Sequence, residues 1–324
     1  MFTQLSRLLL TLALAATTLP ALSQAQKFPA KPVRIIVGAP PGTAPDVVLR
    51  LLTSRFNDVL GVAGIVDNRP GGGGMIAINA VAGSPSDGHT LLMADTAMYA
   101  VGPHQNADND PLRLLQPVML AGISPLFFAV SNNSNATNLK DFIAYAKGNP
   151  GLPYGSSGQS SAHHLFMELL KARAGLQMNH IPYKGAAGAI AALVSGDVAA
   201  VFSANLLFPL AKAGKLRILA VAADRRLAIT PDIPTFAEAG FSGFDVSPVT
   251  YGVFAPLNTP SAVTGAIRST IAGIEREPAI VLRLDELGVV SPSDHSLENF
   301  TATIQRERAQ YGQLIRTMGL EMKN

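Results

Sequence analysis

The chain has 324 residues, no cysteine, a formal net charge of +3, and 15% charged residues. The absence of cysteine excludes disulfides, cysteine–metal sites and cysteine nucleophiles. So small a charge, spread along the chain, excludes an extended nucleic-acid surface. A chain of this length can bury a large core without disulfides and is expected to form about two lobes.

The N-terminal segment has the pattern of a secretory signal peptide. Arg7 precedes an apolar run at residues 8–22, and Ser23-Gln24-Ala25 places small residues before a cleavage site. A membrane anchor is the alternative, but the run is short for a bilayer span of about 20 residues. No cysteine follows that could carry a lipid. We therefore expect a signal peptide at residues 1–25 and a mature chain in the periplasm.

Short apolar segments alternate with helix-like segments along the mature chain, which predicts an α/β fold with mostly parallel sheets. Strands are expected first at residues 33–38, 65–68 and 90–94, with helices at 47–60 and 76–82. The pattern then repeats, with strands at residues 126–131, 152–156, 180–183, 198–203 and 216–222. Helices are expected at residues 139–147 and 162–174, and residues 261–318 are mostly helical in pattern.

Two seams interrupt this pattern, near residues 122–125 and 243–251. If the chain crosses at both, one lobe comprises residues 26–123 and 252–324 and the other comprises residues 124–251. Each lobe is then a sheet flanked by helices, with two hinge crossings. Open α/β sheets bind ligands outside the carboxyl ends of their strands, so a ligand site is expected between the lobes.

The first candidate junction is VGAPPGTAPDVVLRLL, residues 37–52. Thr43 and Asp46 have the spacing of a capping box, in which the carboxylate accepts from the Thr43 amide. Asp46 is structural on this interpretation, and a ligand contact on the alternative one. The amides at residues 42–44 are expected to remain free for an anion. The chain has neither a P-loop lysine here nor a G-x-S-x-G turn.

Three further junctions follow expected strand ends. In NRPGGGGMIAINAVA, residues 68–82, four glycines can expose amides to a ligand or form a flexible loop. Asp95 and Thr96 follow the third strand. In YGSSGQSSAHHLFMELL, residues 154–170, serines gather at a helix N-terminus, where the dipole favours negative charge. One of them, Ser160 or Ser161, is expected to be the N-cap.

The two main junctions could hold an anion between backbone amides without an arginine. His163 and His164 are adjacent on a helix and face apart, so we expect no metal, and nothing points to a cofactor. A serine hydrolase is the competing hypothesis, with one of these histidines as base. A nucleophile and base so close at a helix start cannot easily form the required hydrogen bond, and no acid is placed to orient the base. We therefore expect no enzyme.

Seven segments carry a resemblance to a known family: FPAKPVRIIVGAPPG, DNRPGGGG, SDGHTLL, HIPYKG, KAGKLRILAV, PDIPTFAEAGF and FAPLNTP. In this order they resemble the periplasmic substrate-binding receptors of tripartite tricarboxylate transporters, often called Bug proteins, over residues 27–323. The resemblance implies a type II periplasmic binding (Venus flytrap) fold. It also implies a monomer that closes over a small carboxylate and serves a membrane transporter, or alternatively a membrane sensor, with no nucleic-acid partner.

The resemblance also implies the ligand contacts. The implied residues are Pro41, Gly42, Thr43, Asp46, Gly72, Gly73, Gly74, Met75, Asp95, Thr96, Ser156, Ser157, Gly158, Ser160, Ser161 and His163, together with Asn205 at a strand end and Tyr251. The chain departs from the family pattern in two places. Its first loop reads PPGTAPD where the family usually has PPGGGTD, and Val249-Thr250-Tyr251 stands shortly before FAP, where a tryptophan is common. The choice of acid is therefore expected to differ from that of better-known members.

Overall fold

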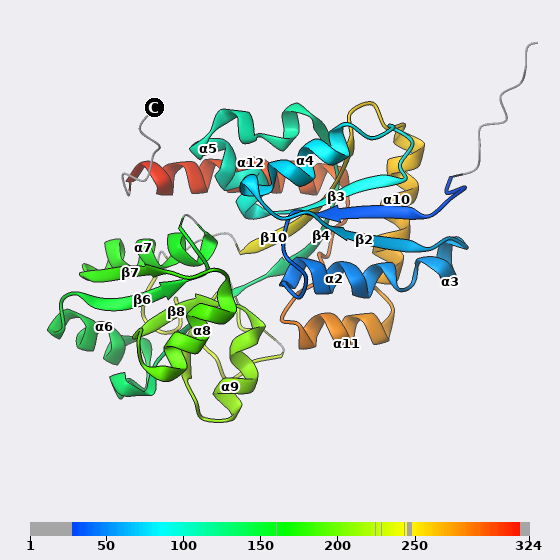
Figure 1. Cartoon of the computed structure of the whole chain (residues 1–324). Helices are drawn as coiled ribbons and strands as arrows, with labels where there is room; N and C mark the ends of the chain where they lie inside the picture. The colour runs from blue at the N-terminus through cyan, green and yellow to red at the C-terminus, as the bar shows by residue number, and fades with distance from the viewer. Residues whose placement is uncertain are drawn as a thin grey trace, which may run out of the picture.

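A computed structural model describes residues 28–159, 161–223, 225–227, 229–242, 244 and 248–317. The expected signal peptide and Ser160 lie outside the described residues. The described residues form two mixed α/β sheets, each flanked by helices (Figure 1). The predicted α/β fold with two sheets is confirmed. No helix in these ranges has both the length and the apolar character needed to cross a bilayer.

The first sheet has the order β2-β1-β3-β10-β4. Its strands are β1 (Val33–Val37), β2 (Gly64–Asn68), β3 (Thr90–Asp95), β4 (Leu115–Ser124) and β10 (Val249–Pro256). β10 is antiparallel to both of its neighbours, whereas β1, β2 and β3 pair in parallel. The accompanying helices are α2 (Ala44–Thr53), α3 (Phe56–Leu60), α4 (Met75–Ala82), α5 (Gly102–Gln105), α10 (Ser261–Ile274), α11 (Pro278–Glu286) and α12 (Leu297–Thr317). Short helical turns are η1 (Gly72–Gly74), η2 (Ala97–Val101), η3 (Ala107–Asn109) and η4 (Pro111–Arg113).

The second sheet repeats this arrangement, with the order β7-β6-β8-β5-β9. Its strands are β5 (Leu126–Val130), β6 (Leu152–Ser156), β7 (Met178–Pro182), β8 (Ala200–Ser203) and β9 (Arg217–Ala222). Its helices are α6 (Leu139–Gly148), α7 (Ala162–Ala174), α8 (Ala186–Ser195) and α9 (Phe208–Lys212), with turns η5 (Asn132–Ser134) and η6 (Asn205–Leu207). β5 is antiparallel to β8 and β9. In each sheet, the antiparallel strand is the one that the chain forms on arriving from the other sheet.

Three expectations about local structure were wrong. The helix expected at residues 47–60 is divided into α2 and α3, because the Thr53 and Ser54 hydroxyls donate to carbonyls of α2 at its last turn. β4 and β10 were not expected as strands. Pro117 interrupts the apolar run of β4, and a proline normally argues against a strand. The sheet tolerates it because Pro117 lies opposite Phe254, next to a shift in register.

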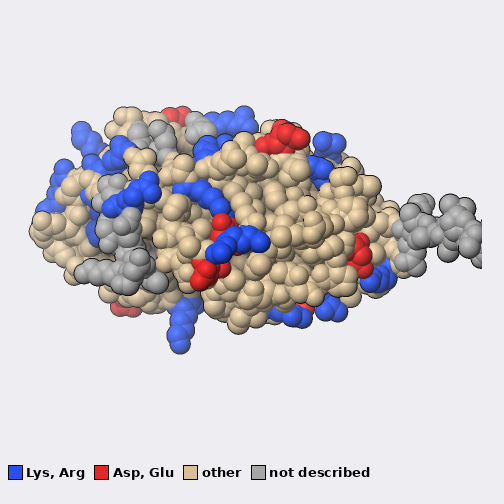
Figure 2. Space-filling view, turned by 90° about the horizontal axis from the view of Figure 1, so that it is seen from above, with Lys and Arg blue, Asp and Glu red and all other residues tan. Residues whose placement is uncertain are grey.

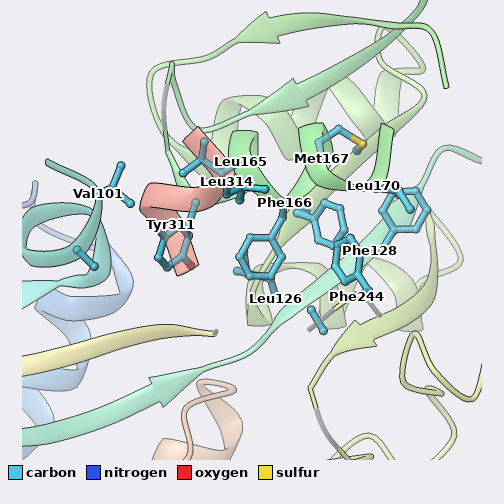
Figure 3. Packing of buried hydrophobic residues seen from close by; sticks show 14 of the residues in the cluster. Val101, Leu126, Phe128, Leu165, Phe166, Met167, Leu170, Phe244, Tyr311 and Leu314 are labelled. Atoms are coloured by element: carbon cyan, nitrogen blue, oxygen red, sulfur yellow. The ribbon is translucent and has the colours of Figure 1, made fainter. Parts of the chain in front are cut away.

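The largest core cluster contains residues of both sheets. Its members on α12 include Tyr311 and Leu314, and those on α7 include Leu165 and Phe166. α12 contacts α7, and Figure 3 shows Tyr311 and Leu314 beside Leu165. The C-terminal half of α12 therefore joins the two lobes by apolar packing, in addition to the strand crossing from β4 to β5.

Candidate functional site

A cavity of about 450 Å³ lies at the carboxyl ends of β1 and β3. Most of its lining comes from the first sheet and its loops, and Gln159 and Ser161 come from the loop before α7 of the second. Ligand cavities typically measure about 300–1,000 Å³, and the ends of parallel strands are where open α/β sheets bind ligands. The cavity is therefore the candidate ligand site.

One wall of the cavity is the glycine loop before α4, which contributes Gly71, Gly73 and Gly74. Four consecutive glycines have positive φ, from Gly71 at 117° to Gly74 at 96°. A Cβ atom on Gly74 would lie 2.5 Å from Met98 Cε, whereas one on Gly73 would meet only Asn109 Nδ2, at 3.7 Å. The loop conformation therefore requires glycine, and at Gly74 the packing requires it as well.

The first loop, before α2, differs from the expected capping box. Asp46 Oδ2 accepts from the Gly42 amide at 2.9 Å, one residue before the expected donor. The Thr43 hydroxyl and amide both donate to the Pro40 carbonyl, at 2.7 and 3.4 Å. Gly42 has a φ of 80°, which turns its amide toward Asp46. The amides of Gly42 and Thr43 are therefore used within the loop, contrary to the expectation that they are free.

Asp46 holds this loop to the end of β2. Its side chain is 2% exposed, accepts from Asn68 Nδ2 at 2.8 Å and pairs with Arg50 Nη2 at 3.0 Å. Burial raises the pKa of Asp46, but hydrogen bonds from Arg50, Gly42 and Asn68 outweigh it and the net pKa is lowered. These contacts support the structural interpretation of Asp46. Pro41, Gly42 and Thr43 do not line the cavity, whereas Pro40 and Pro45 do.

The side chains of Asp95 and Thr96, at the end of β3, face different parts of the molecule. Asp95 lines the cavity, and its Oδ1 accepts from the Met98 amide at 3.1 Å. Burial raises the pKa of Asp95 more than the amides of Met98 and Ala97 lower it. Thr96 is fully buried and faces the interior, where its hydroxyl contacts Thr250 Oγ1 at 3.1 Å and Glu307 Oε2 at 3.3 Å.

Glu307 of α12 is the charged member of this interior network. Its Oε2 accepts from the Tyr99 hydroxyl at 2.9 Å and from Thr250 Oγ1 at 3.0 Å. Burial raises the pKa of Glu307 to about 7, although the hydrogen bonds from Tyr99 and Thr250 favour the charged form. The network joins Thr96, which directly follows β3, to η2, β10 and α12.

The second loop, before α7, is held by neutral hydrogen bonds. Ser161 is the N-cap of α7, as predicted for Ser160 or Ser161: its Oγ accepts from the His164 amide at 3.3 Å. Buried Ser156 contacts His180 Nε2 at 2.6 Å and accepts from the Gly158 amide at 3.1 Å. Ser156, Ser157 and Gly158 thus shape the loop, and of its described residues Gln159 and Ser161 line the cavity.

The two adjacent histidines face apart, as predicted. His163 Nδ1 contacts Ser157 Oγ at 2.7 Å, whereas the His164 ring stacks on His180 with 3.9 Å between centroids. Burial lowers the pKa of both His163 and His164. In the ranges that the structure describes, no group of histidine, aspartate and glutamate side chains could hold a metal ion.

A serine and a histidine so close at a helix start were expected not to hydrogen-bond easily, and this was wrong, because Ser157 and His163 do so. Their contact forms across the turn that Gly158 makes with a φ of 139°. A catalytic triad also needs an acid bonded to the histidine. The described residues place no carboxylate in hydrogen-bonding contact with His163, which does not line the cavity.

The remaining expected contacts lie outside the cavity lining. Gly72 lies between the lining glycines Gly71 and Gly73, and Met75 follows the lining Gly74. Asn205 begins η6 and packs against the loop after α11, where a Cβ atom on Gly288 would lie 3.0 Å from Asn205 Cβ. Tyr251 is 3% exposed and pairs with Asp95 across β3 and β10, and burial raises the pKa of its hydroxyl.

Three polar residues of the lining were not expected: Gln105, Asn109 and Gln159. Gln105 ends α5 and Asn109 ends η3, and no spacing in the sequence indicated that both would line the cavity. Asp95 is the one ionisable side chain among the described lining residues. On the face in Figure 2, basic and acidic side chains are scattered between broad uncharged areas. Any anion in the cavity must therefore be held by neutral donors.

Two similar α/β sheets, with a ligand-sized cavity at their strand ends, define a solute-binding receptor. Residues 48–320 match the family model described as tripartite tricarboxylate transporter family receptor. The chain belongs to this family, whose members are periplasmic solute-binding proteins and not enzymes.

Relatives and solved structures agree over most of the chain. The chain is 34% identical over 308 residues to a UPF0065 protein of Bordetella pertussis, covering 92% of this chain and 93% of that protein. It is 31% identical to Protein BugT of Bordetella pertussis, covering 96% of each. Rpa4515 of R. palustris, solved with adipate, is 28% identical, with a TM-score of 0.82 over 90% of this chain and 98% of that one. MatC of Rhodopseudomonas palustris, solved with bound malate, is 25% identical, with a TM-score of 0.78 over 89% and 100%.

Proposed function

We propose that this receptor binds a small organic acid in the 450 Å³ cavity and delivers it to the membrane subunits of a tripartite tricarboxylate transporter. The observation that carries the proposal is a cavity at the strand ends, in a family member, that offers neutral donors from both sheets. Gln105 and Asn109 offer side-chain amides from one side, and Gln159 offers an amide from the other. The Ser161 hydroxyl lines the cavity but donates to the Gly158 carbonyl at 2.8 Å. Two similar structures were solved with adipate and with malate, which supports an acid ligand.

Closure of the two lobes over the ligand is part of the proposal. The lobes comprise residues 26–123 with 252–324, and residues 124–251. The hinges lie near the crossing from β4 to β5 and near the start of β10. Rotation about them brings Gln159 and Ser161 toward the glycine loop, because these groups line one cavity from opposite sheets. Hinge closure around a ligand is an established motion of periplasmic binding proteins.

The signal-peptide pattern of residues 1–25 supports export to the periplasm, where the mature protein acts as a monomer. N-terminal sequencing of the protein recovered from periplasmic extract tests this part. A chain that begins near Gln26 supports it, and an uncleaved chain that stays with the membrane contradicts it.

A thermal-shift screen of the mature chain, refolded to remove bound ligand, tests the binding function. The panel contains adipate, malate, citrate, amino acids and aromatic acids. A ligand at one hundred times its dissociation constant stabilises by about 2.7 kcal/mol, and each kcal/mol shifts the midpoint by roughly 2 °C in a chain of this size. We expect a shift of about 5 °C with one class of acid.

A matched pair of variants connects the shift to the cavity. Gln105→Ala removes an amide from the lining, whereas Gln177→Ala removes an exposed one elsewhere. We expect Gln105→Ala to weaken binding about tenfold, which corresponds to the roughly 1.4 kcal/mol of one hydrogen bond, and Gln177→Ala to leave it unchanged. If no acid shifts the wild-type midpoint, the proposed function is wrong.

A further inference from the structure

The cavity contains one charged group, Asp95, and no basic side chain among its described lining residues. A carboxylate is an unfavourable neighbour for an anionic ligand, because two like charges repel strongly where water is excluded. A cavity that binds a simple dicarboxylate would be expected to contain no carboxylate side chain. The position of Asp95 therefore carries information about the ligand.

The Asp95 side chain faces the cavity from the end of β3. Alternation along the strand places it on the same face as Met93, which also lines the cavity. Its Oδ1 accepts from the Met98 amide, so the carboxylate also begins the η2 turn. A carboxylate offers about four acceptor positions, and a neutral asparagine would serve this turn equally well. The turn alone does not explain the charge.

The groups around Asp95 do not neutralise it. Asp95 takes part in none of the ion pairs found among the described residues. Its electrostatic neighbours are the hydroxyls of Tyr251 and Tyr311, whose pKa values it helps to raise. A partly buried charge without a counter-charge is costly, and burial accordingly raises the pKa of Asp95. The missing counter-charge is available from one source that enters the cavity, the ligand.

We propose that the ligand of this cavity is a zwitterion, an acid with a basic nitrogen whose ammonium group binds the Asp95 carboxylate while neutral donors hold its own carboxylate. This inference rests on the proposed function and adds the substrate class. The ammonium supplies up to three donors and the charge that Asp95 lacks. Acids of equal length without the nitrogen place no counter-charge beside Asp95.

Isothermal titration calorimetry with matched pairs of acids tests the inference on the mature chain. The pairs are succinate and aspartate, glutarate and glutamate, and adipate and 2-aminoadipate, which differ by one ammonium group. We expect at least one amino acid to bind tenfold or more tightly than its partner. The preference should also weaken as the pH falls, because protonation of Asp95 removes the charge that the ammonium needs.

Two variants assign the preference to Asp95. Asp95→Asn keeps an oxygen for the Met98 amide, so the unliganded midpoint should change little, and the affinity for the amino acid should fall tenfold or more. Asp108→Asn removes the same charge from a nearby side chain that is 85% exposed and outside the lining, and both affinities should stay unchanged.

The outcomes separate the two proposals. A preference for the amino acid that Asp95→Asn abolishes supports the inference. If the plain acids bind as tightly or more tightly in the wild type, and Asp95→Asn leaves the ratio unchanged, the inference is wrong and the acid receptor stands. If no acid of these pairs and no acid of the thermal-shift panel binds, both proposals are wrong.

Discussion

The two sheets share one strand order, but the loops that they contribute to the cavity are stabilised by different chemistry. In the first lobe, the buried carboxylate of Asp46 joins the loop before α2 to Arg50 and Asn68. In the second, Ser156 and Ser161 hold the loop before α7 through neutral contacts with His180 and the backbone. One topology therefore allows either a charged or a neutral anchor at equivalent strand ends.

One buried glutamate in the first lobe and a pair of histidines in the second respond oppositely to pH. Glu307 in the first lobe has a raised pKa, so its burial favours the protonated form. His164 and His180 in the second have lowered pKa values, so their burial favours the neutral form. Acid should therefore stabilise the interior network of the first lobe and destabilise the stacked histidines of the second.

The largest expected effect is loss of the charged anchor. Asp46→Ala leaves three donors, on Arg50, Asn68 and the Gly42 amide, without their acceptor. At about 1 kcal/mol for each lost hydrogen bond, it should lower the free energy of unfolding by about 3 kcal/mol. Urea unfolding measures it. Asp141→Ala in the second lobe is the matched control, because that carboxylate is exposed and bonds Thr137 and Asn138 locally. Asp141→Ala should lower the free energy of unfolding much less than Asp46→Ala. Equal decreases in the two variants would contradict the special role of Asp46.

Titration of Glu307 should have the next largest effect. Below the ordinary glutamate pKa of 4.5, the group is protonated in both the folded and the unfolded chain. Between pH 4.5 and about 7 the unfolded chain loses the proton first, so stability falls as pH rises, by about 3 kcal/mol at 1.36 kcal/mol per pKa unit. Glu307→Gln should remove this slope, whereas Glu298→Gln, at an exposed position of α12, should retain it. An unchanged slope in Glu307→Gln would assign the effect elsewhere.

The stacked histidines should give a smaller slope of opposite sign. Their lowered pKa values mean that the unfolded chain binds protons first below pH 6.5, so stability falls as pH falls toward about 4. At 1.36 kcal/mol per pKa unit the shift of His164 corresponds to about 3 kcal/mol, and we expect about 2 kcal/mol because the neighbouring ring, His180, is only half-buried and solvent screens the pair. Measured in the Glu307→Gln background, His164→Phe keeps an aromatic ring in the stack and should reduce the acid slope. A slope that His164→Phe leaves intact would exclude the stack as its source.

Part of the fold and part of the candidate site could be predicted from the sequence, where neighbouring residues alone determine the local structure. The bounds of β6 and α7 were predicted correctly, because Gly151 directly precedes β6 and Gly175 caps the end of α7. β10 was missed because its position between β3 and β4 depends on contacts far apart in the chain. Within the candidate site, the glycine loop, Asp95 and Ser161 were named from their places at strand ends.

The other site details depended on tertiary contacts that sequence patterns do not encode. Capping boxes are defined by spacing, but Gly42 turned its amide toward Asp46 and displaced the expected bond. Thr96 directly follows the strand end, yet it faces Glu307, a residue 211 positions away in the chain. Gln105 and Asn109 follow a π-helical turn, which changes the face that each presents.

The smallest effects should come from a pair of glycines that occupy comparable loops in the two lobes. Gly73 and Gly158 both have positive φ, 62° and 139°, and a Cβ atom on either would have no contact closer than 3.6 Å. Gly73→Ala and Gly158→Ala should therefore each cost only backbone strain, about 1–2 kcal/mol, in thermal unfolding without ligand. Their effects on binding should differ, because Gly73 lines the cavity and Gly158 does not. A methyl group at Gly73 should weaken acid binding in calorimetry, and equal binding losses in the two variants would mean that the second loop contacts the ligand through its backbone as closely as the first.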